Sequence, residues 1–491
     1  MADGLRGPTG QAGAVDGNNS TTHADHAASR STIFALSSAP GRAGVAVIRL
    51  SGPRAHEVAA QMAGALPPVR TASLRRLVDP SDGDASEERL LDHALVLRFD
   101  APHSFTGEDV VEFHVHGGRA VVDGVLSALA TMRGLEPAEP GAFTRRAFDH
   151  GKLDLTGVEG LADLIDADTV AARDLALAQA GGSLRETYER WRTTLIQAQA
   201  LTEAAIDFSD EADVSDDAFG QASALVGKLG EALRAHLADA NRGEIIRSGY
   251  RVALTGLPNA GKSSLLNALV QRDAAIVAAT PGTTRDVIEV KIDVGGQAVV
   301  LWDTAGVRET ADEIERQGVE RALARADDAD LVLWLWAPGT SPRVPAALKA
   351  LPVVALATKA DVRPATEPGP AGGSAVAVGS PDAEASPEPP AAISVRTGEG
   401  MAAFTAWLAG RAAAATASAG SNAPPPTRPR HRYELQRVVA ALEAFANGPA
   451  DETELRAEDL RQAALALGRL TGRVDVEHVL DEIFGSFCIG K

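Results

Sequence analysis

The N-terminal part of the chain alternates short apolar runs with turns. Strand-like stretches at 45–52 and 110–118 precede helical spacing from about residue 120 to 132, which predicts a compact α+β domain over residues 31–152. Residues 1–30 are polar and lack the apolar segment of a secretory signal, so we expect a disordered extension there.

Apolar residues then take up helical spacing through residues 153–245 and again over residues 430–491. Neither stretch alone makes a full helical bundle, so we expect the two to pack together as one discontinuous domain. A Pro- and Ala-rich linker, 413–429, precedes the second part. The residues between the two helical parts are therefore predicted to form an inserted domain.

The inserted segment, 246–412, has the pattern of a parallel α/β domain. Its apolar runs at 298–302, 331–336 and 353–357 are typical of buried parallel strands. A tract rich in Pro, Ala, Gly and Ser over 363–390 predicts a flexible surface insertion. The predicted fold class is multidomain α/β: an N-terminal α+β domain, a discontinuous helical domain, and an inserted α/β domain.

Length and composition limit the number of domains, the binding partners and the cellular compartment that are expected. The 491 residues have room for about three domains, and a net charge of −19 argues against nonspecific nucleic-acid binding over the whole surface. A local basic patch remains compatible with that charge. The single cysteine, Cys488, excludes an intrachain disulfide and a cysteine-based zinc cluster, which favours the reducing cytoplasm. The apolar run 331–336 is too short to cross a bilayer, so no membrane insertion is expected.

Residues 256–264 read Gly-Leu-Pro-Asn-Ala-Gly-Lys-Ser-Ser, between a strand-like and a helix-like segment. This is the sequence and the context of a phosphate-binding loop. The backbone N–H groups of such a loop surround the phosphates, Lys262 reaches the outer phosphates, and the Ser263 hydroxyl can bind Mg²⁺. A chance glycine turn is the alternative for this segment taken alone.

Further segments follow in order. Residues 283–286 read Thr-Thr-Arg-Asp, 303–306 read Asp-Thr-Ala-Gly, 358–361 read Thr-Lys-Ala-Asp, and 394–396 read Ser-Val-Arg. Together with the loop they resemble the five motifs of a Ras-like, translation-factor-like GTPase. The inserted domain is therefore predicted to be a P-loop GTPase.

This resemblance implies roles for individual residues. Thr284 would complete the Mg²⁺ shell, Asp303 would hold the ion through water, and Asp361 would accept hydrogen bonds from guanine with Lys359 beside it. The base-reading motif usually begins with Asn, where this chain has Thr358, so guanine selectivity rests mainly on Asp361. We prefer GTP over ATP because no adenine-specific pattern appears. The expected GTP contacts are Asn259, Ala260, Gly261, Lys262, Ser263, Ser264, Thr283, Thr284, Asp303, Thr304, Ala305, Gly306, Lys359, Asp361, Ser394, Val395 and Arg396.

Segments outside the GTPase motifs point to one family. They are Ser-Phe-Thr-Gly-Glu-Asp at 104–109, His-Gly-Gly at 116–118, Gly-Lys-Leu-Asp-Leu at 151–155, Gly-Thr-Thr-Arg-Asp at 282–286 and Phe-Cys-Ile-Gly-Lys at 487–491. With these, residues 31–491 resemble the tRNA-modification GTPases of the MnmE family, also called TrmE. The C-terminal pentapeptide and the N-terminal segments are specific to that family, whereas the GTPase motifs are shared by many proteins.

The resemblance implies a homodimer joined through N-terminal domains that bind a tetrahydrofolate one-carbon donor, a 5-formyl or methylene derivative. With an FAD-dependent partner, MnmG, in a heterotetramer, such a protein adds an aminomethyl or carboxymethylaminomethyl group to C5 of the wobble uridine of certain tRNAs. GTP hydrolysis with Mg²⁺, activated by potassium-dependent pairing of the GTPase domains, drives the cycle.

The catalytic residues differ from those of many small GTPases. Val307 stands where a glutamine usually orients the attacking water, so another polar group has to do so. By match to the family motif we expect Glu315 in that role, with Lys262 on the phosphates; a solvated switch helix is the alternative for Glu315.

In the family a potassium ion replaces an arginine finger. Carried over, its ligands are Asn259 and Thr283, with backbone carbonyls near Ala278 and Thr280. A monovalent cation beside the phosphates would supply positive charge in the transition state. Asn259 is otherwise an ordinary turn residue.

The family pattern assigns folate contacts to four charged residues: Arg49, Glu112, Lys152 and Lys491. The glutamate would read the pterin ring, and Arg49 and Lys152 would meet the polar and anionic groups of the folate. Arg49 falls in phase with Val45 and Val47, where a charge needs a partner or an anionic ligand. Without the resemblance, an ordinary salt bridge explains these charges.

Two further sites stay open. Cys488 is either a small buried hydrophobe or a functional thiol of the modification step. The best local tRNA candidate, or else a solvated helix start, is the basic run of Arg428, Arg430, His431, Arg432 and Arg437.

A second function remains an alternative, in which the GTPase is a binding switch for assembly of a ribonucleoprotein such as a ribosomal subunit. Reduced-folate binding by residues 31–152 distinguishes the two, since only the modification enzyme requires it.

Overall fold

The computed structural model describes residues 31–80, 89–207, 212–256, 259–272, 275–277, 288–303, 328–339, 343–362, 377–378, 388–417, 423–449, 452–474, 477–485, 487 and 489–491. The chain divides into two compact units. One comprises residues up to Lys152 together with Val479–Lys491, and the other is Leu153–His478. The exact residues at which the predicted domains begin and end remain predictions.

The first unit is built on a six-stranded sheet of order β3-β4-β5-β2-β1-β6. Its antiparallel strands are β1 (Thr32–Leu36), β2 (Ala43–Ser51), β3 (Ser73–Val78), β4 (Leu90–Phe99) and β5 (Val110–Gly117), and β6 (Leu135–Pro137) pairs with β1 in parallel. The helices are α1 (Ala55–Ala63), α2 (Arg119–Thr131) and α3 (Ala142–Asp149).

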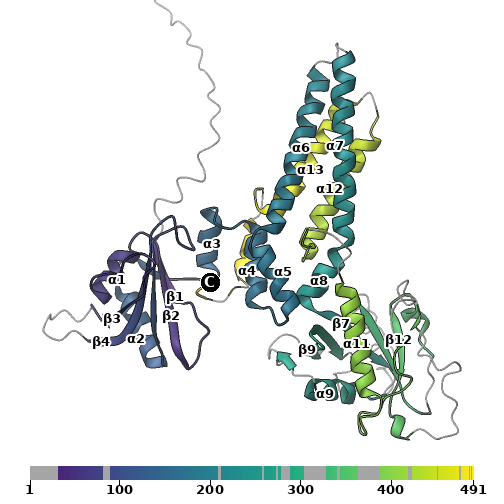
Figure 1. The fold of residues 1–491 in the computed structure, drawn as a ribbon, viewed down its shortest axis with the longest axis horizontal. Helices are drawn as coiled ribbons and strands as arrows, with labels where there is room; N and C mark the ends of the chain where they lie inside the picture. Colours follow the sequence, from purple (N-terminus) through teal and green to yellow (C-terminus); the bar gives the residue numbers. More distant parts are fainter. Residues whose placement is uncertain are drawn as a thin grey trace, which may run out of the picture. The chain divides into compact units, whose positions relative to one another are not determined.

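Alternation along the strands separates two faces of this sheet. Ile48, Leu50 and Phe113 are fully buried in a core that they share with α1 and α2, which lie against the sheet in Figure 1. The other face meets α3 through Phe143. The predicted α+β domain is confirmed.

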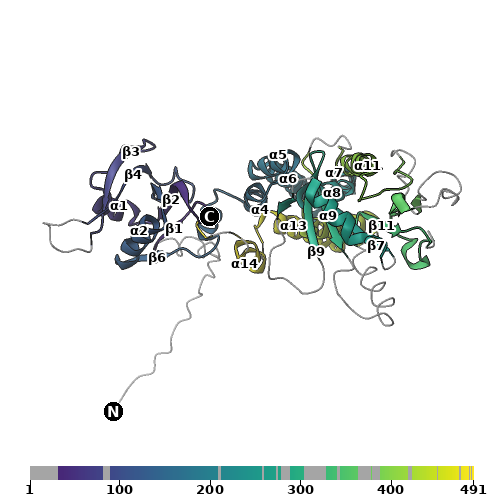
Figure 2. The same ribbon diagram turned by 90° about the horizontal axis from the view of Figure 1, so that it is seen from below.

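The end of the chain belongs to this first unit. The last helix, α14 (Glu477–Gly485), leads to an isolated bridge between Ile489 and Pro140. Gly490 has φ of 95°, and a Cβ atom there would come within 2.1 Å of the Leu36 carbonyl oxygen, so only glycine fits. Figures 1 and 2 both place the C-terminus beside β1 and β2. Residues Val479–Lys491 thus group with the first unit, and the predicted extent of the helical domain to residue 491 stays a prediction.

The second unit contains the helical bundle. Its helices are α4 (Leu155–Ile165), α5 (Val170–Ala180), α6 (Ser183–Asp207), α7 (Ala212–Ala238), α8 (Ala240–Ser248), α12 (Pro429–Asn447) and α13 (Thr453–Thr471). The long helices α6, α7, α12 and α13 run side by side in Figure 1 around one buried core that includes Leu195, Leu233 and Phe445. The prediction that helices before and after the inserted domain pack together is confirmed.

The inserted domain has a seven-stranded sheet of order β13-β12-β11-β7-β10-β9-β8. Its elements are β7 (Tyr250–Gly256), α9 (Lys262–Arg272), β8 (Ala275–Val277), β9 (Ile288–Val294), β10 (Gln297–Asp303), β11 (Leu331–Trp336), the 3₁₀ turns η2 (Ala346–Leu348) and η3 (Ala360–Val362), β12 (Val353–Ala357), β13 (Ala377–Val378) and α11 (Met401–Thr416).

Strands β7, β10, β11 and β12 are parallel, and every residue of β11 and β12 is buried, because the sheet carries a core on both faces. The predicted α/β domain is confirmed. The tract predicted to be a flexible insertion, 363–390, contributes β13, which pairs with β12; most of it lies outside the described residues. None of the described helices is long and apolar enough to span a bilayer.

Candidate nucleotide-binding site

The loop between β7 and α9 depends on glycine at both ends. A Cβ atom on Gly256 would lie 2.2 Å from the Leu335 carbonyl oxygen, so only glycine lets β7 end this close to β11. Gly261, just before α9, has φ of 91°, and Asn259 has φ of 59°, a conformation that Asn tolerates better than most residues. The sequence thus forms the expected strand, tight loop and helix.

Lys262 begins α9 and folds back over the loop. Its Nζ donates to the carbonyl oxygen of Gly256 at 2.9 Å. Ser263 and Ser264 follow on the exposed first turn of the helix, where the backbone N–H groups and the helix dipole favour an anion. The predicted role of the Ser263 hydroxyl as a Mg²⁺ ligand stays a prediction.

The motif predicted to read the base, residues 358–361, follows β12. Asp361 accepts a hydrogen bond from the Ser394 hydroxyl at 2.6 Å and pairs with Arg396 Nε at 2.9 Å. These partners, Ser394 above all, lower the pKa of Asp361 from its ordinary value. Two segments predicted to act together, 358–361 and 394–396, therefore meet in the structure, and the carboxylate is charged and held in place as an acceptor.

Other expected residues are only partly visible. Asp303 ends β10, whose backbone pairs in parallel with β7 opposite Leu254, and its side chain lies outside the described residues. The remaining residues predicted to act in this domain and in the tail lie outside the described residues: Ala278, Thr280, Thr283, Thr284, Thr304, Ala305, Gly306, Glu315 and Cys488.

In the first unit, Arg49 of β2 and Glu112 of β5 are opposite each other in register and form an ion pair with Nε to Oε1 at 2.9 Å. The Arg49 guanidinium also lies 5.5 Å from the Phe105 ring centre and 5.6 Å from that of Phe143. The expected salt bridge exists, and it lies on the face opposite the α1–α2 core, because residues 46, 48 and 50 are the ones that fill that core.

Lys152 lies beside the turn at Gly107, and Lys491 follows Gly490. No hydrogen bond or ion pair joins either lysine to Arg49 or Glu112 among the residues that the structure describes.

Part of the basic run that is the local tRNA candidate contacts acidic residues inside the protein. Glu159 of α4, 1% exposed, accepts from His431 Nε2 at 2.7 Å and from Arg430 Nη2 at 3.0 Å. Arg428 pairs with Asp163 at 2.7 Å. Arg432 and Arg437 pair with Glu244 and Glu434. The side chains of Arg432 and Arg437 nevertheless stay 40% and 39% exposed. A contact of these two with tRNA stays a prediction, whereas the interpretation as a solvated helix start is wrong for the fully buried His431.

Burial would raise the pKa of Glu159, but the charges of His431 and Arg430 outweigh burial and hold that pKa well below its usual value. Sequence reasoning missed this acid because its partners lie more than 260 residues away along the chain. No local pattern marks such a contact.

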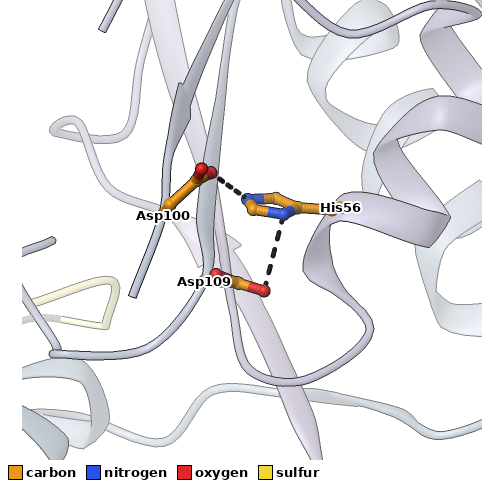
Figure 3. Close-up of side chains that lie close together, drawn as sticks. All are labelled: His56, Asp100 and Asp109. Carbon is orange, nitrogen blue, oxygen red and sulfur yellow. Dashed lines mark ion pairs between the residues drawn. The ribbon is translucent and has the colours of Figure 1, made fainter. Parts of the chain in front are cut away.

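A second cluster joins His56, Asp100 and Asp109, as Figure 3 shows. The His56 ring lies between the two carboxylates, with Nε2 3.6 Å from Asp100 and Nδ1 3.5 Å from Asp109. A metal ion needs donor atoms that converge on one point, whereas each ring nitrogen here faces a different carboxylate. Asp100 is also bound by Arg98 at 2.7 Å. The cluster therefore ties the start of α1 to the end of β4 and the start of β5.

Comparison with known families decides the identity. A model of the GTP-binding protein TrmE N-terminus matches residues 32–152, and a model of the MnmE helical domain matches residues 155–488. The tRNA modification GTPase MnmE of Parvibaculum lavamentivorans is 50% identical over 94% of this chain and 100% of its own length. That of Phenylobacterium zucineum is 49% identical over 94% of this chain and 99% of its own length. The chain belongs to the MnmE family of tRNA modification GTPases.

This MnmE-family chain is accordingly a GTP-hydrolysing enzyme of tRNA modification. Solved structures with similar segments include the G domain of the T. maritima FeoB iron transporter, 23% identical over 34% of this chain and 98% of that chain with a TM-score of 0.23. Another is Aquifex aeolicus Era Y63A bound to GDP and AlF4⁻, 22% identical over 32% of this chain and 56% of that chain with a TM-score of 0.22.

Proposed function

We propose that GTP hydrolysis at the loop 256–264 serves the modification of wobble uridine at C5 in certain tRNAs, in the cytoplasm. A homodimer of this chain acts with an FAD-dependent MnmG-type partner and takes a one-carbon unit from a tetrahydrofolate derivative. The observation that supports this best is the presence, in one MnmE-family chain, of a nucleotide loop and of a separate charged and aromatic site in the first unit.

The nucleotide site suits guanosine triphosphate. Lys262 and the N–H groups at the start of α9 would bind the phosphates, Ser263 and Thr284 would hold Mg²⁺, and Asp361 would accept from the N1–H and 2-amino groups of guanine. An ion held there would neutralise negative charge on the phosphates. Glu315 remains the proposed residue for orienting water.

The first-unit site suits a reduced pterin. Glu112 would offer a carboxylate to ring N–H donors and Arg49 a cation, and the rings of Phe105 and Phe143 lie beside the guanidinium. Both charged side chains are less than 20% exposed, at 18% for Arg49 and 16% for Glu112, so a ligand there would be partly removed from water.

We expect Glu112→Gln to weaken binding of 5-formyltetrahydrofolate at least about tenfold, because hydrogen bonds to a charged acceptor are worth about 1.5–3 kcal/mol. Isothermal titration of the full chain measures this. Glu57→Gln is the matched control, since Glu57 is an exposed acid paired with Arg54 in the same unit. Absence of any heat with the unaltered protein would sink the folate assignment, and equal affinity of the two variants would remove Glu112 from it.

We expect GTP turnover to be at least about tenfold faster in potassium chloride than in sodium chloride at equal ionic strength. A potassium ion held by Asn259 and Thr283 would place positive charge beside the phosphates where charge develops in the transition state. Steady-state phosphate release measures the rate, and matched ionic strength removes general screening. Equal rates in the two salts would retire the potassium mechanism while leaving the GTPase itself intact.

A further inference from the structure

The phosphate loop and the base-reading loop are joined by one buried hydroxyl. Thr358, 5% exposed, places Oγ1 2.7 Å from the Ala260 carbonyl oxygen and 3.0 Å from that of Trp336. The Trp336 oxygen already accepts from the Thr358 backbone N–H at 2.8 Å. Because a hydroxyl has only one proton to donate, the shorter contact to Ala260 takes it. The end of β12 is therefore tied to the loop between β7 and α9.

The backbone on either side of this tie is unusual. Asn259 immediately precedes Ala260 and has φ of 59°, and Lys359 immediately follows Thr358 and has φ of 52°. Among the described residues Arg70 is the only other non-glycine residue with positive φ. A lysine in the left-handed region is unfavourable and persists where its surroundings fix it. The hydrogen bond from Thr358 to Ala260 holds the backbone next to both Asn259 and Lys359.

Packing brings the same two loops into contact. A Cβ atom on Gly261 would lie 3.9 Å from Thr358 Cβ and Oγ1, so this side chain fills the space directly beside the phosphate loop. The carboxylate that would read the base is positioned separately, by Ser394 on Asp361. The hydroxyl of Thr358 thus contacts backbone carbonyl oxygens of the protein, so its proton is not available to a nucleotide base.

We propose that Thr358 is a positioning residue for the nucleotide. Its hydroxyl sets the separation between the phosphate loop and Asp361, and it does not read guanine itself. Threonine here keeps the connection between the loops and leaves selectivity for the base to Asp361. This inference rests on nucleotide binding at the site proposed above.

The test compares Thr358→Val, which has the same shape without the hydroxyl, with Thr358→Ser, which keeps it. We expect Thr358→Val to bind GDP about tenfold more weakly, since it leaves the buried Ala260 carbonyl without this donor. Inosine diphosphate, which lacks the 2-amino group, should weaken by the same factor. Thr358→Ser should stay within about twofold of the unaltered chain. Fluorescence titration and dissociation rates of labelled GDP on the full chain give these values.

Three results would overturn the proposal. They are GDP binding by Thr358→Val at the unaltered affinity, equal weakening of Thr358→Ser and Thr358→Val, and a selective loss of GDP relative to inosine diphosphate. If Thr358→Val does not fold, Thr358→Ser decides: retained affinity supports the hydroxyl tie and lost affinity contradicts it. A failure of the unaltered chain to bind GDP would refute the nucleotide site itself, which separates the two claims.

Discussion

Replacing Lys262 by alanine is expected to reduce GTP turnover at least about 100-fold. Its ammonium stands at the N-terminus of α9 and donates to the Gly256 carbonyl, so it lies over the loop where the outer phosphates would bind. Loss of one preorganised donor to charge in a transition state costs about 10²–10³ in rate. Single-turnover phosphate release measures the chemical step separately from nucleotide binding.

Lys349→Ala is the control for that experiment, because Lys349 is an exposed lysine that follows η2 in the same domain. Its turnover should match that of the unaltered chain. The same two variants extend the test to tRNA: cells that carry only Lys262→Ala should lack the modified wobble uridine, whereas Lys349→Ala should restore it. Normal turnover in Lys262→Ala would contradict the assignment of the phosphate site.

Removing the carboxylate of Glu159 is expected to lower the free energy of unfolding of the second unit by about 3–5 kcal/mol. This residue is 1% exposed and receives His431, Arg430 and, at 3.6 Å, Arg428. Breaking a buried ion pair by deleting one partner leaves the remaining charges uncompensated in a low-dielectric interior. Denaturant unfolding of Glu159→Ala, followed by helix content, measures the change.

Glu458→Ala serves as the matched control, since that glutamate makes an exposed pair with Arg461 and should change stability by less than about 0.5 kcal/mol. The dependence of the free energy of unfolding on low pH gives a second measurement. The folded-state pKa of Glu159 is lowered, so the unfolded state binds its proton first; this stabilisation is present above about pH 4.5 and is lost as the pH falls below it. Glu159→Ala should therefore lose less stability in acid, and equal acid sensitivity would count against the ion-pair account.

The fold followed from the sequence wherever a short-range pattern carries the information. Apolar residues that recur about every two or every 3.6 residues show which side chains face a core. These periods were enough to predict the two sheets and the helical bundle. The loop 256–264 and Asp361 could be predicted because their chemistry requires particular residue types at fixed spacing. Ser394 was predicted only as a GTP contact, and the structure shows that its hydroxyl donates to Asp361.

Features that depend on remote partners could not be predicted in the same way. Arg430 looked like a surface cation because its partner Glu159 belongs to a distant helix. The pairing of Ala377–Val378 with β12 was hidden inside a tract of loop-forming composition. Alternation alone grouped Arg49 with Val45 and Val47, and only the structure shows that this row faces away from the α1–α2 core.

The docking of Gly490 against Leu36 has a practical consequence for handling this protein. The bridge from Ile489 to Pro140 and the absence of space for a side chain at position 490 anchor the tail within one residue of Lys491. A purification tag or fluorescent protein fused after Lys491 would have to emerge directly from this anchored segment. Fusions are better placed at the N-terminal end, so that the C-terminal residues of the fusion protein keep their contacts with Leu36 and Pro140.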